Sequence, residues 1–262
     1  MRIRQNFGFN QMQLMNKVIL ITGGSRGIGS VTAIKAAARG YAVVINYKGN
    51  KQAADEVIDE IVFDGGKAIA VQADISKEED VINLFKTADG AFGPVTALVN
   101  NAGILEKQSV VAEMNVERLQ RIFAVNVIGT FLCAREAVKR MSAKFGGKGG
   151  GIVNVSSKAA AHGSPFEYVD YAATKGAVDT FTVGLSKEVA ADGIRVNAVR
   201  PGIIYTDIHA SGGEPGRADR VGPTVPMGRG GQPQEVADTI LWLLSDEASY
   251  ITGALIDVTG GR

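Results

Sequence analysis

The sequence contains 262 residues, of which 45% are hydrophobic, and it carries a formal net charge of +1. This length lets an α/β domain bury a large core, and the ordinary apolar fraction argues against a disordered chain. The balanced charge offers little attraction to phosphate backbones, so we expect no nucleic-acid partner. The two histidines, His162 and His209, lack partners at metal-ligand spacing, so we expect no metal site.

The first sixteen residues contain no apolar run long enough for the core of a signal peptide. We interpret residues 1–16 as an N-terminal extension, with Met15 as an alternative start, and residues 17–262 as a single domain. No later segment reaches 18 uninterrupted apolar residues, so we expect no membrane span. The one cysteine, Cys133, cannot form an internal disulfide, which favours a buried structural thiol and a reducing cytoplasm.

Short, almost uninterrupted apolar runs alternate with longer helical patterns from residue 17 onward. Such runs are typical of strands buried on both faces, and their alternation with helices predicts an α/β fold with a doubly wound, mostly parallel sheet of seven strands. The expected strands are residues 17–22, 42–47, 68–73, 97–100, 152–156, 195–199 and 255–258. Ser76 and Glu79 have the spacing of a capping box, which predicts a helix that begins there and closes near Gly90.

A glycine-rich turn follows the first expected strand and opens the first helix. Glycines let the backbone approach a pyrophosphate, which then lies at the positive end of the helix. The alternative is a glycine-rich turn without a ligand. We expect nucleotide contacts from Gly23, Ser25, Arg26, Gly27, Ile28 and Gly29.

The end of the second expected strand bears on the choice of cofactor. NAD enzymes usually place an acidic residue there for the ribose 2′-hydroxyl, but this strand ends in Asn46, Tyr47 and Lys48. An acid would repel a 2′-phosphate by up to ~4 kcal/mol at about 4 Å and an effective dielectric of about 20. Arg26 supplies a guanidinium suited to phosphate, although it could instead point to solvent. We therefore predict that NADP(H) is preferred and NAD(H) possible, beside Asn46 and Tyr47.

The third and fourth expected strands end at the edge where open α/β sheets bind ligands. Asp74 could accept a hydrogen bond from an adenine amino group, with Ile75 beside it, or could act only as an acid at a helix N-terminus. Two amides followed by Ala102 and Gly103 indicate backbone against the cofactor ribose, with one amide also tying strands together. The cofactor residues expected here are Asp74, Ile75, Asn101, Ala102 and Gly103.

Tyr171 and Lys175 are four residues apart at the start of an expected helix, so they share one face. A tyrosine titrates near ~10, and a neighbouring cation favours its phenolate, which makes it a better acid and base near neutral pH. Tyr168 has Ala172 at the corresponding position and lacks such a cation. The Tyr-x-x-x-Lys spacing alone is a weak signal, because it recurs by chance on many helices.

Two further polar positions accompany this pair. Ser156 and Ser157 end the preceding strand, and one of them could bond a substrate carbonyl beside the phenol. Asn126 interrupts an apolar helical stretch, and a water or the Lys175 ammonium is its natural partner. Each of these could be structural on its own.

With 22–29, 100–103, Asn126, Ser157, Tyr171 and Lys175 together, residues 16–262 strongly resemble the short-chain dehydrogenase/reductase family. The chain is most similar to the branch of 3-oxoacyl-[acyl-carrier-protein] reductases and sugar-alcohol dehydrogenases, and its tail is similar to uncharacterised bacterial oxidoreductases. The resemblance implies a Rossmann fold in which Tyr171 is the acid/base, Lys175 lowers its pKa and holds the nicotinamide ribose, Ser157 orients the carbonyl and Asn126 anchors a relay water. It also implies nicotinamide contacts from Pro201, Gly202, Ile204 and Thr206, and a homotetramer or homodimer.

Some features depart from the family or stay open. Serine to tyrosine spans 14 residues, one more than in many relatives, and Arg200 stands where small residues are common. Residues 207–231 are predicted to form a mobile lid whose arginines could meet an anionic substrate or only solvent. Phe166, Tyr168, Tyr205 and Ile208 could wall a partly apolar pocket.

These observations predict an NADP(H)-dependent enzyme that reversibly reduces a small carbonyl compound. Two alternatives stay open. An NAD-dependent sugar or secondary alcohol dehydrogenase would use the same residues. A non-catalytic NADP-binding regulator would keep the glycines but tends to lose the Tyr–Lys pair, which is intact here.

Overall fold

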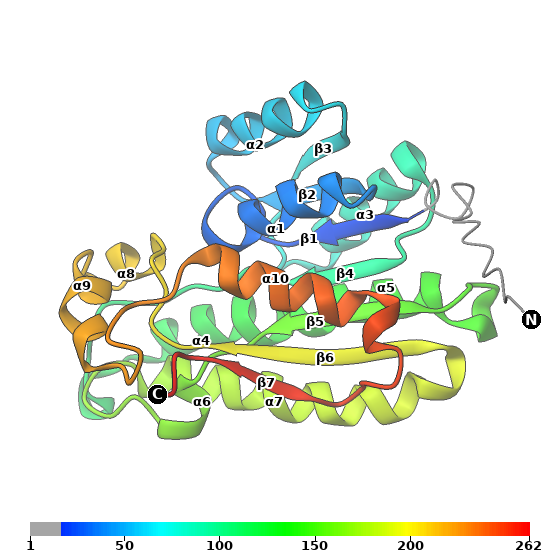
Figure 1. Cartoon of the computed structure of the whole chain (residues 1–262). Helices are drawn as coiled ribbons and strands as arrows, with labels where there is room; N and C mark the ends of the chain where they lie inside the picture. The colour runs from blue at the N-terminus through cyan, green and yellow to red at the C-terminus, as the bar shows by residue number, and fades with distance from the viewer. Residues whose placement is uncertain (1–16) are drawn as a thin grey trace, which may run out of the picture.

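In the computed structural model, residues 17–262 form a central sheet with helices on both faces (Figure 1). The strands stand in the order β3-β2-β1-β4-β5-β6-β7. From the central pair β1 and β4, strands β2 and β3 follow on one side of the sheet, and β5, β6 and β7 follow on the other. They are β1 (Val18–Ile21), β2 (Ala42–Tyr47), β3 (Lys67–Gln72), β4 (Ala97–Asn100), β5 (Gly150–Val155), β6 (Ile194–Pro201) and β7 (Leu255–Val258). The predicted seven-stranded, doubly wound sheet is confirmed, and every strand pair is parallel. The predicted extension, residues 1–16 with Met15, lies outside the described residues.

Two helical layers bury the sheet. The layer of α1, α2 and α10 covers one face, and that of α3, α5 and α7 covers the other. The α-helices are α1 (Gly27–Ala38), α2 (Lys51–Phe63), α3 (Glu78–Phe92), α4 (Val116–Phe123), α5 (Gly129–Met141), α6 (Ala159–His162), α7 (Val169–Val189), α8 (Ile208–Ser211), α9 (Arg217–Val221) and α10 (Pro233–Leu244). Short 3₁₀ helices lie at Val111–Glu113, Ala143–Phe145, Ala190–Asp192, Gly222–Thr224 and Asp246–Ala248. Across residues 17–262, no helix is both long and apolar enough to cross a membrane.

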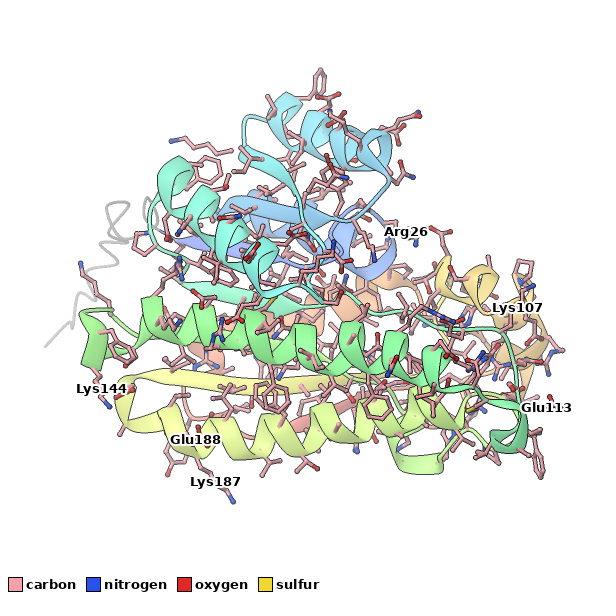
Figure 2. All side chains as sticks on the ribbon, turned by 180° about the vertical axis from the view of Figure 1, so that it is seen from behind. Arg26, Lys107, Glu113, Lys144, Lys187 and Glu188 are labelled. Atoms are coloured by element: carbon pink, nitrogen blue, oxygen red, sulfur yellow. The ribbon has the colours of Figure 1, made fainter. Side chains whose placement is uncertain are left out.

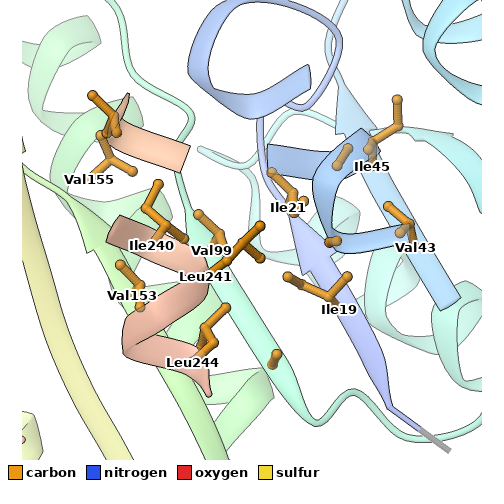
Figure 3. Packing of buried hydrophobic residues seen from close by; sticks show 14 of the residues in the cluster. Ile19, Ile21, Val43, Ile45, Val99, Val153, Val155, Ile240, Leu241 and Leu244 are labelled. Atoms are coloured by element: carbon orange, nitrogen blue, oxygen red, sulfur yellow. The ribbon is translucent and has the colours of Figure 1, made fainter. Parts of the chain in front are cut away.

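The central strands are apolar throughout because both of their faces are covered. In β1, Ile19 and Ile21 belong to the cluster that packs against α10, whereas Leu20 belongs to the cluster of the opposite layer. Successive side chains of a strand point to opposite faces, so an uninterrupted apolar run fills both layers. Figure 3 shows Ile240 and Leu241 of α10 over the side chains of β1, β4 and β5.

A π-helical segment, Ala124–Ile128, joins α4 to α5 in one continuous helical rod. The N-terminus of this rod is capped by Asn115, whose side-chain oxygen accepts a hydrogen bond from the Arg118 N–H at 2.9 Å. A π segment adds one residue to a helical turn and often marks a functional region.

The start of α3 differs from the prediction. The Ser76 hydroxyl donates to Asp74 Oδ1 at 2.7 Å, and the Asp80 carboxylate accepts from the Asp74 N–H at 2.9 Å. The helix begins at Glu78 without a side-chain cap and ends at Phe92. The predicted capping box at Ser76 is therefore wrong, because the nearby Asp74 carboxylate competes for the serine hydroxyl.

All strands end at the same edge of the sheet, at the left of Figure 1, where α8, α9 and the C-terminus also lie. Parallel pairing brings the residues that follow each strand together at this edge, although they are far apart in sequence. The candidate site is built there.

Candidate active site

A cavity of about 850 Å³ lies at the carboxyl edge of the sheet. This volume is in the range of small-molecule sites, ~300–1,000 Å³. Gly29 and Asn126 are not part of its lining. The sequence-predicted residues that do line it are Gly23, Ser25, Arg26, Gly27, Ile28, Asn46, Tyr47, Asp74, Ile75, Asn101, Ala102, Gly103, Ser157, Tyr171, Lys175, Pro201, Gly202, Ile204 and Thr206.

The backbone of the glycine turn adopts a conformation and makes close approaches that a side chain would not allow. Gly23 has a φ of +62°, in the left-handed region that favours glycine. A Cβ atom on Gly29 would lie 2.5 Å from both Asn101 Nδ2 and the Gly23 carbonyl oxygen. Gly29 therefore allows α1 to start close against the end of β4.

Hydrogen bonds join the turn after β1 to the end of β4. The Asn101 side-chain amide donates to the Thr22 and Gly23 carbonyl oxygens at 2.9 and 3.0 Å. The Thr22 hydroxyl oxygen accepts from the backbone N–H groups of Asn101 and Ala102, both at 3.0 Å. The predicted role of an amide in tying strands together is thus found at Asn101.

The N-terminus of α1 faces the cavity without a side-chain cap. Arg26 is the capping residue of this helix, and its side chain makes no cap hydrogen bond. Uncapped N–H groups in the first turn of a helix are donors for an anion. The turn can therefore accept a phosphate group by its backbone as well as by the Arg26 guanidinium.

Asn46 supports the glycine turn from behind. Its side chain is 2% exposed, accepts from the Gly23 N–H at 3.3 Å and donates to the Ala73 carbonyl at 2.8 Å. Lys48 also lines the cavity, and its Nζ lies 2.7 Å from Asp74 Oδ2. Lys48 was not predicted as a site residue. Its position directly after a strand, at the carboxyl edge of the sheet, is the sequence feature that indicates a place at the site.

Tyr171 and Lys175 lie in the first two turns of α7 and both line the cavity. Lys175 is 4% exposed, and its Nζ lies 5.5 Å from the centroid of the Tyr171 ring. This ammonium donates to the Val155 carbonyl at 2.7 Å. Tyr168 has a different environment, because its hydroxyl donates to the Gly212 carbonyl at 3.2 Å and its ring lies under the Arg217 guanidinium.

The start of α7 is fixed by an ion pair that sequence reasoning missed. The Asp170 carboxylate is fully buried and accepts from the Tyr171 N–H at 2.9 Å. Arg118 of α4 donates to the same carboxylate at 2.7 Å and to the Lys107 carbonyl at 2.6 Å. Because the pair joins residues 52 positions apart, local sequence patterns carry no sign of it.

The two serines after β5 have different environments. Ser156 is 2% exposed, and its hydroxyl donates to the Lys175 carbonyl at 3.2 Å. Ser157 is only partly buried, and its hydroxyl oxygen accepts from the Ala159 N–H at 3.1 Å. Both serines line the cavity. The Ser157 hydroxyl also lowers the pKa of Tyr171, against the larger effect of burial.

Asn126 lies in the π-helical segment and is 1% exposed. Its oxygen accepts from the Ile104 N–H at 2.8 Å, and its amide donates to the Ile104 carbonyl at 3.0 Å and to the Thr174 hydroxyl at 3.1 Å. The Lys175 ammonium, one of the two alternative partners expected for Asn126, donates to the Val155 carbonyl instead. A Cβ on Gly103 would lie 3.4 Å from Asn126 Oδ1 and 3.5 Å from Lys175 Nζ, so this glycine leaves the space beside these two polar groups free of a side chain.

Burial determines the electrostatics of the Tyr–Lys pair. Burial raises the pKa of Tyr171 to about 12, with the Ser157 hydroxyl acting in the opposite direction. Burial lowers the pKa of Lys175 to about 8, with the Asp179 carboxylate acting in the opposite direction. The expected lowering of the Tyr171 pKa by Lys175 is therefore not found here, since desolvation of the phenolate is the larger effect. The phenol is protonated at neutral pH.

The arginines of residues 207–231 are paired with carboxylates of the chain. Arg217 is paired with Glu167 and Glu214, and Arg220 is paired with Glu214. Arg229 is paired with Glu235 at 2.7 Å. These pairs favour a structural role for the predicted lid arginines over binding of an anionic substrate.

Residues 207–231, predicted to form a lid, contribute residues of the short helices α8 and α9 to the cavity wall. Ile208 and Tyr168 line the cavity as expected, whereas Phe166 and Tyr205 do not belong to its lining.

Within residues 17–262, no cluster of three or more His, Cys, Asp or Glu side chains is placed to hold a metal ion.

Comparisons with known proteins give consistent matches over almost the whole chain. A family model described as enoyl-(acyl carrier protein) reductase matches residues 23–262. The chain is 60% identical to the uncharacterized oxidoreductase YgfF of Escherichia coli (strain K12), over 94% of this chain and 99% of that protein. It is 42% identical to a 3-oxoacyl-[acyl-carrier-protein] reductase of a Synechocystis strain, over 95% of this chain and 97% of that protein.

A solved structure has the same arrangement. The crystal structure of a 3-ketoacyl-(acyl-carrier-protein) reductase from Brucella melitensis, complexed with NADH, superposes with a TM-score of 0.87 at 38% sequence identity. The match covers 95% of this chain and 99% of that chain.

The buried ammonium predicts a pH-dependent difference in stability. The pKa of Lys175 falls from 10.5 to about 8 on folding, so between these values the unfolded chain binds more protons and folding stability rises with pH. We expect the unfolding free energy of the wild type minus that of Lys175→Met to increase by about 3 kcal/mol across this window in urea denaturation. Lys187→Met, an exposed position on the same helix, should give a constant difference. A constant difference for Lys175→Met would contradict the lowered pKa.

Proposed function

Because this chain belongs to the short-chain dehydrogenase/reductase family of NAD(P)-dependent oxidoreductases, we propose that it reversibly reduces a small carbonyl compound to an alcohol with NADP(H) as the preferred cofactor. The observation that carries the proposal is one cavity lined both by the glycine turn after β1 and by Ser157, Tyr171 and Lys175. A nucleotide cradle and a proton-donating group at one cavity are the requirements of carbonyl reduction.

The residues present fit a nicotinamide dinucleotide. The first turn of α1 offers uncapped N–H donors, and the glycines keep side chains away from the cradle. At Gly103, a Cβ would occupy the space between Asn126 and Lys175, which suits a ribose hydroxyl. Pro201, Gly202, Ile204 and Thr206 would border the nicotinamide. When bound, the cofactor supplies the hydride that is exchanged with the substrate.

Tyr171 is proposed to hold the proton that the substrate oxygen receives. Its raised pKa of about 12 keeps the phenol protonated at neutral pH, and an alkoxide forming on the substrate is a stronger base than a phenolate. The Ser157 hydroxyl would orient the carbonyl oxygen and stabilise the charge that develops on it. Lys175 would carry its ammonium close to the phenol and hold the ribose.

Asn126 is proposed to anchor a proton-relay water by fixing the residues around it, without contacting the Lys175 ammonium. Its amide fixes the backbone of Ile104 and the Thr174 hydroxyl. The space at Gly103 beside Lys175 Nζ is free of a side chain. A water held in that space would connect Lys175 to solvent.

Two cations support the preference for NADP(H). Arg26, in the turn after β1, and Lys48, directly after β2, both line the cavity, and the Asp74 carboxylate is paired with Lys48. The strand itself ends without an acidic residue. A 2′-phosphate would therefore meet two positive groups and no unpaired carboxylate among the lining residues at this end. The alternative, NAD(H), is favoured by the NADH bound in the Brucella melitensis relative.

We also propose a homotetramer or homodimer. Apolar side chains are exposed along the rod of α4, the π segment and α5, including Val116 at 57%, Ile128 at 51% and Phe131 at 47%. Phe131 lies against Phe181 of α7, with ring centroids 3.9 Å apart. The two helices thus present a joint apolar surface, and such surfaces are typical of subunit contacts.

Tyr171→Phe tests the catalytic role. Loss of the phenol proton should lower turnover at least a hundredfold, while NADPH binding measured by its fluorescence stays within about twofold. Substrates would be screened among ketones, quinones, sugars and acyl thioesters by NADPH absorbance. Tyr168→Phe is the matched control and should keep most of the activity. A Tyr171→Phe enzyme that retains most of its turnover would refute the role.

Arg26→Ala and Lys48→Ala test the cofactor preference. Each removes a charged contact to the 2′-phosphate, so each should weaken NADPH binding roughly tenfold and leave NADH binding almost unchanged. Lys107→Ala, an exposed lysine at the same end of the molecule (Figure 2), is the control. Equal or tighter binding of NADH by the wild type would overturn the proposed preference.

Phe131→Lys tests the association. A charge placed on the apolar surface should lower the mass observed by sedimentation equilibrium below that of the wild type, without changing the circular dichroism spectrum. Phe63→Lys, at an apolar side chain that is 91% exposed on α2, should leave the mass unchanged. A wild type that sediments as a monomer would contradict the proposal.

A further inference from the structure

A carboxylate with an unusual environment lies one helical turn beyond Lys175. The side chain of Asp179 is 13% exposed, and its Oδ1 atom is buried without any hydrogen-bond partner among the described residues. Its Oδ2 atom lies 3.7 Å from Nη1 of Arg200 on β6. Asp179 follows Lys175 by four residues on α7, so the two side chains share one face of the helix.

Asp179 belongs to a row of alternating charges that starts at the site. Arg200, whose position the sequence left unexplained, donates to Asp257 Oδ1 of β7 at 2.6 Å. Lys158, which follows β5 and lines the cavity, donates to Asp257 Oδ2 at 2.6 Å. The charges thus alternate from Lys175 through Asp179, Arg200 and Asp257 to Lys158.

The geometry argues against a purely structural tie between α7 and β6. Arg200 makes its hydrogen bond to Asp257, whereas its approach to Asp179 is longer than a hydrogen bond. A buried carboxylate oxygen without a donor is costly, and such groups in native proteins need an explanation. Burial raises the pKa of the Asp179 carboxyl, whereas the Ser156 hydroxyl, Arg200 and Lys175 act in the opposite direction and favour the carboxylate.

Lys175 needs a nearby negative charge to remain an ammonium. It is 4% exposed and has the Val155 carbonyl as its hydrogen-bond acceptor. Desolvation disfavours its charged form, and the Asp179 carboxylate counteracts this effect on the pKa. The other charged or titratable groups near the pair are Tyr171 on α7, Arg200 on β6 and, through Arg200, Asp257 on β7.

We propose that Asp179 is a positioning residue that keeps the Lys175 ammonium charged inside the site, and that Arg200 and Asp257 hold the Asp179 carboxylate in place. The inference deepens the proposed function, because it assigns the group that maintains the lysine used there. It also gives Arg200 a role behind the site instead of at the cofactor.

The test titrates Lys175 directly in the protein without cofactor or substrate. The ¹³Cε chemical shift of Lys175 would be followed against pH in lysine-labelled protein, with the signal assigned from its absence in Lys175→Arg. We expect the midpoint to fall by about one pH unit in Asp179→Asn, since a neutral amide no longer stabilises the ammonium. Asp179→Glu keeps the charge and should restore most of the midpoint, which a merely structural role would not require.

Two further variants keep the proposal falsifiable if Asp179→Asn fails to fold. Arg200→Met removes the cation that holds the Asp179 carboxylate in place and favours its charged form, so it should shift the Lys175 midpoint downward, in the same direction as Asp179→Asn. Glu188→Gln changes an exposed carboxylate near the far end of the same helix (Figure 2) and should not shift the midpoint. An unchanged midpoint in Asp179→Asn, or a midpoint in Arg200→Met that does not fall, would overturn the proposal.

The outcome is separable from that of the proposed reaction. If the titration shifts as expected but no carbonyl compound is reduced, the assignment of Asp179 stands and the proposed function fails. If turnover is found but the Lys175 midpoint does not respond to Asp179, the function stands and this inference fails.

Discussion

The hydrogen bonds between the turn after β1 and the end of β4 are the constraint on which the site depends. β1 and β4 are neighbours in the sheet, although 75 residues separate the end of the first from the start of the second. Asn101 and Thr22 join their carboxyl ends, and Gly29 lets α1 start close to the same point. Because strand order reverses there, the helices that follow diverge to opposite faces and leave a hollow between them. The cavity is thus a consequence of topology, closed at its base by these few bonds.

A second set of contacts fixes α7 across this hollow. The Asn100 amide donates to Asn154 Oδ1 at 2.9 Å, and the Asn154 amide donates to the Thr182 hydroxyl at 2.9 Å. This chain of bonds joins β4 and β5 to the middle of α7, while Asp170 and Arg118 fix its beginning. Because α7 is held at two points, the face that carries Tyr171 stays directed toward the carboxyl ends of the strands. Preorganisation of this kind makes a polar site effective in a partly dry environment.

Properties that depend on local pattern were predictable from the sequence, and those that depend on distant partners were not. Apolar runs predicted each strand to within two residues at either end, because the core strands fill both layers. The Tyr171 and Tyr168 environments differ as the i, i+4 lysine indicated. The capping box at Ser76 was wrong because Asp74 competes for the hydroxyl. The hydrogen bonds of Asn126, the roles of Lys48 and Arg118, and the partners of Arg200 all rest on contacts across tens of residues, which periodicity cannot reveal.

The π-helical segment at Ala124–Ile128 has a consequence for how the length of this chain can change. An α-helix turns by about 100° per residue, so deleting one residue there would rotate everything before it relative to everything after it. Arg118 would then leave Asp170, while Cys133 and the rest of α5 stayed packed on the sheet. We therefore expect an insertion or deletion in this rod to be poorly tolerated. The extra residue of the π segment sets the rotation that lets Arg118 reach Asp170 while α5 packs on the sheet. We expect length differences among relatives to fall outside this segment.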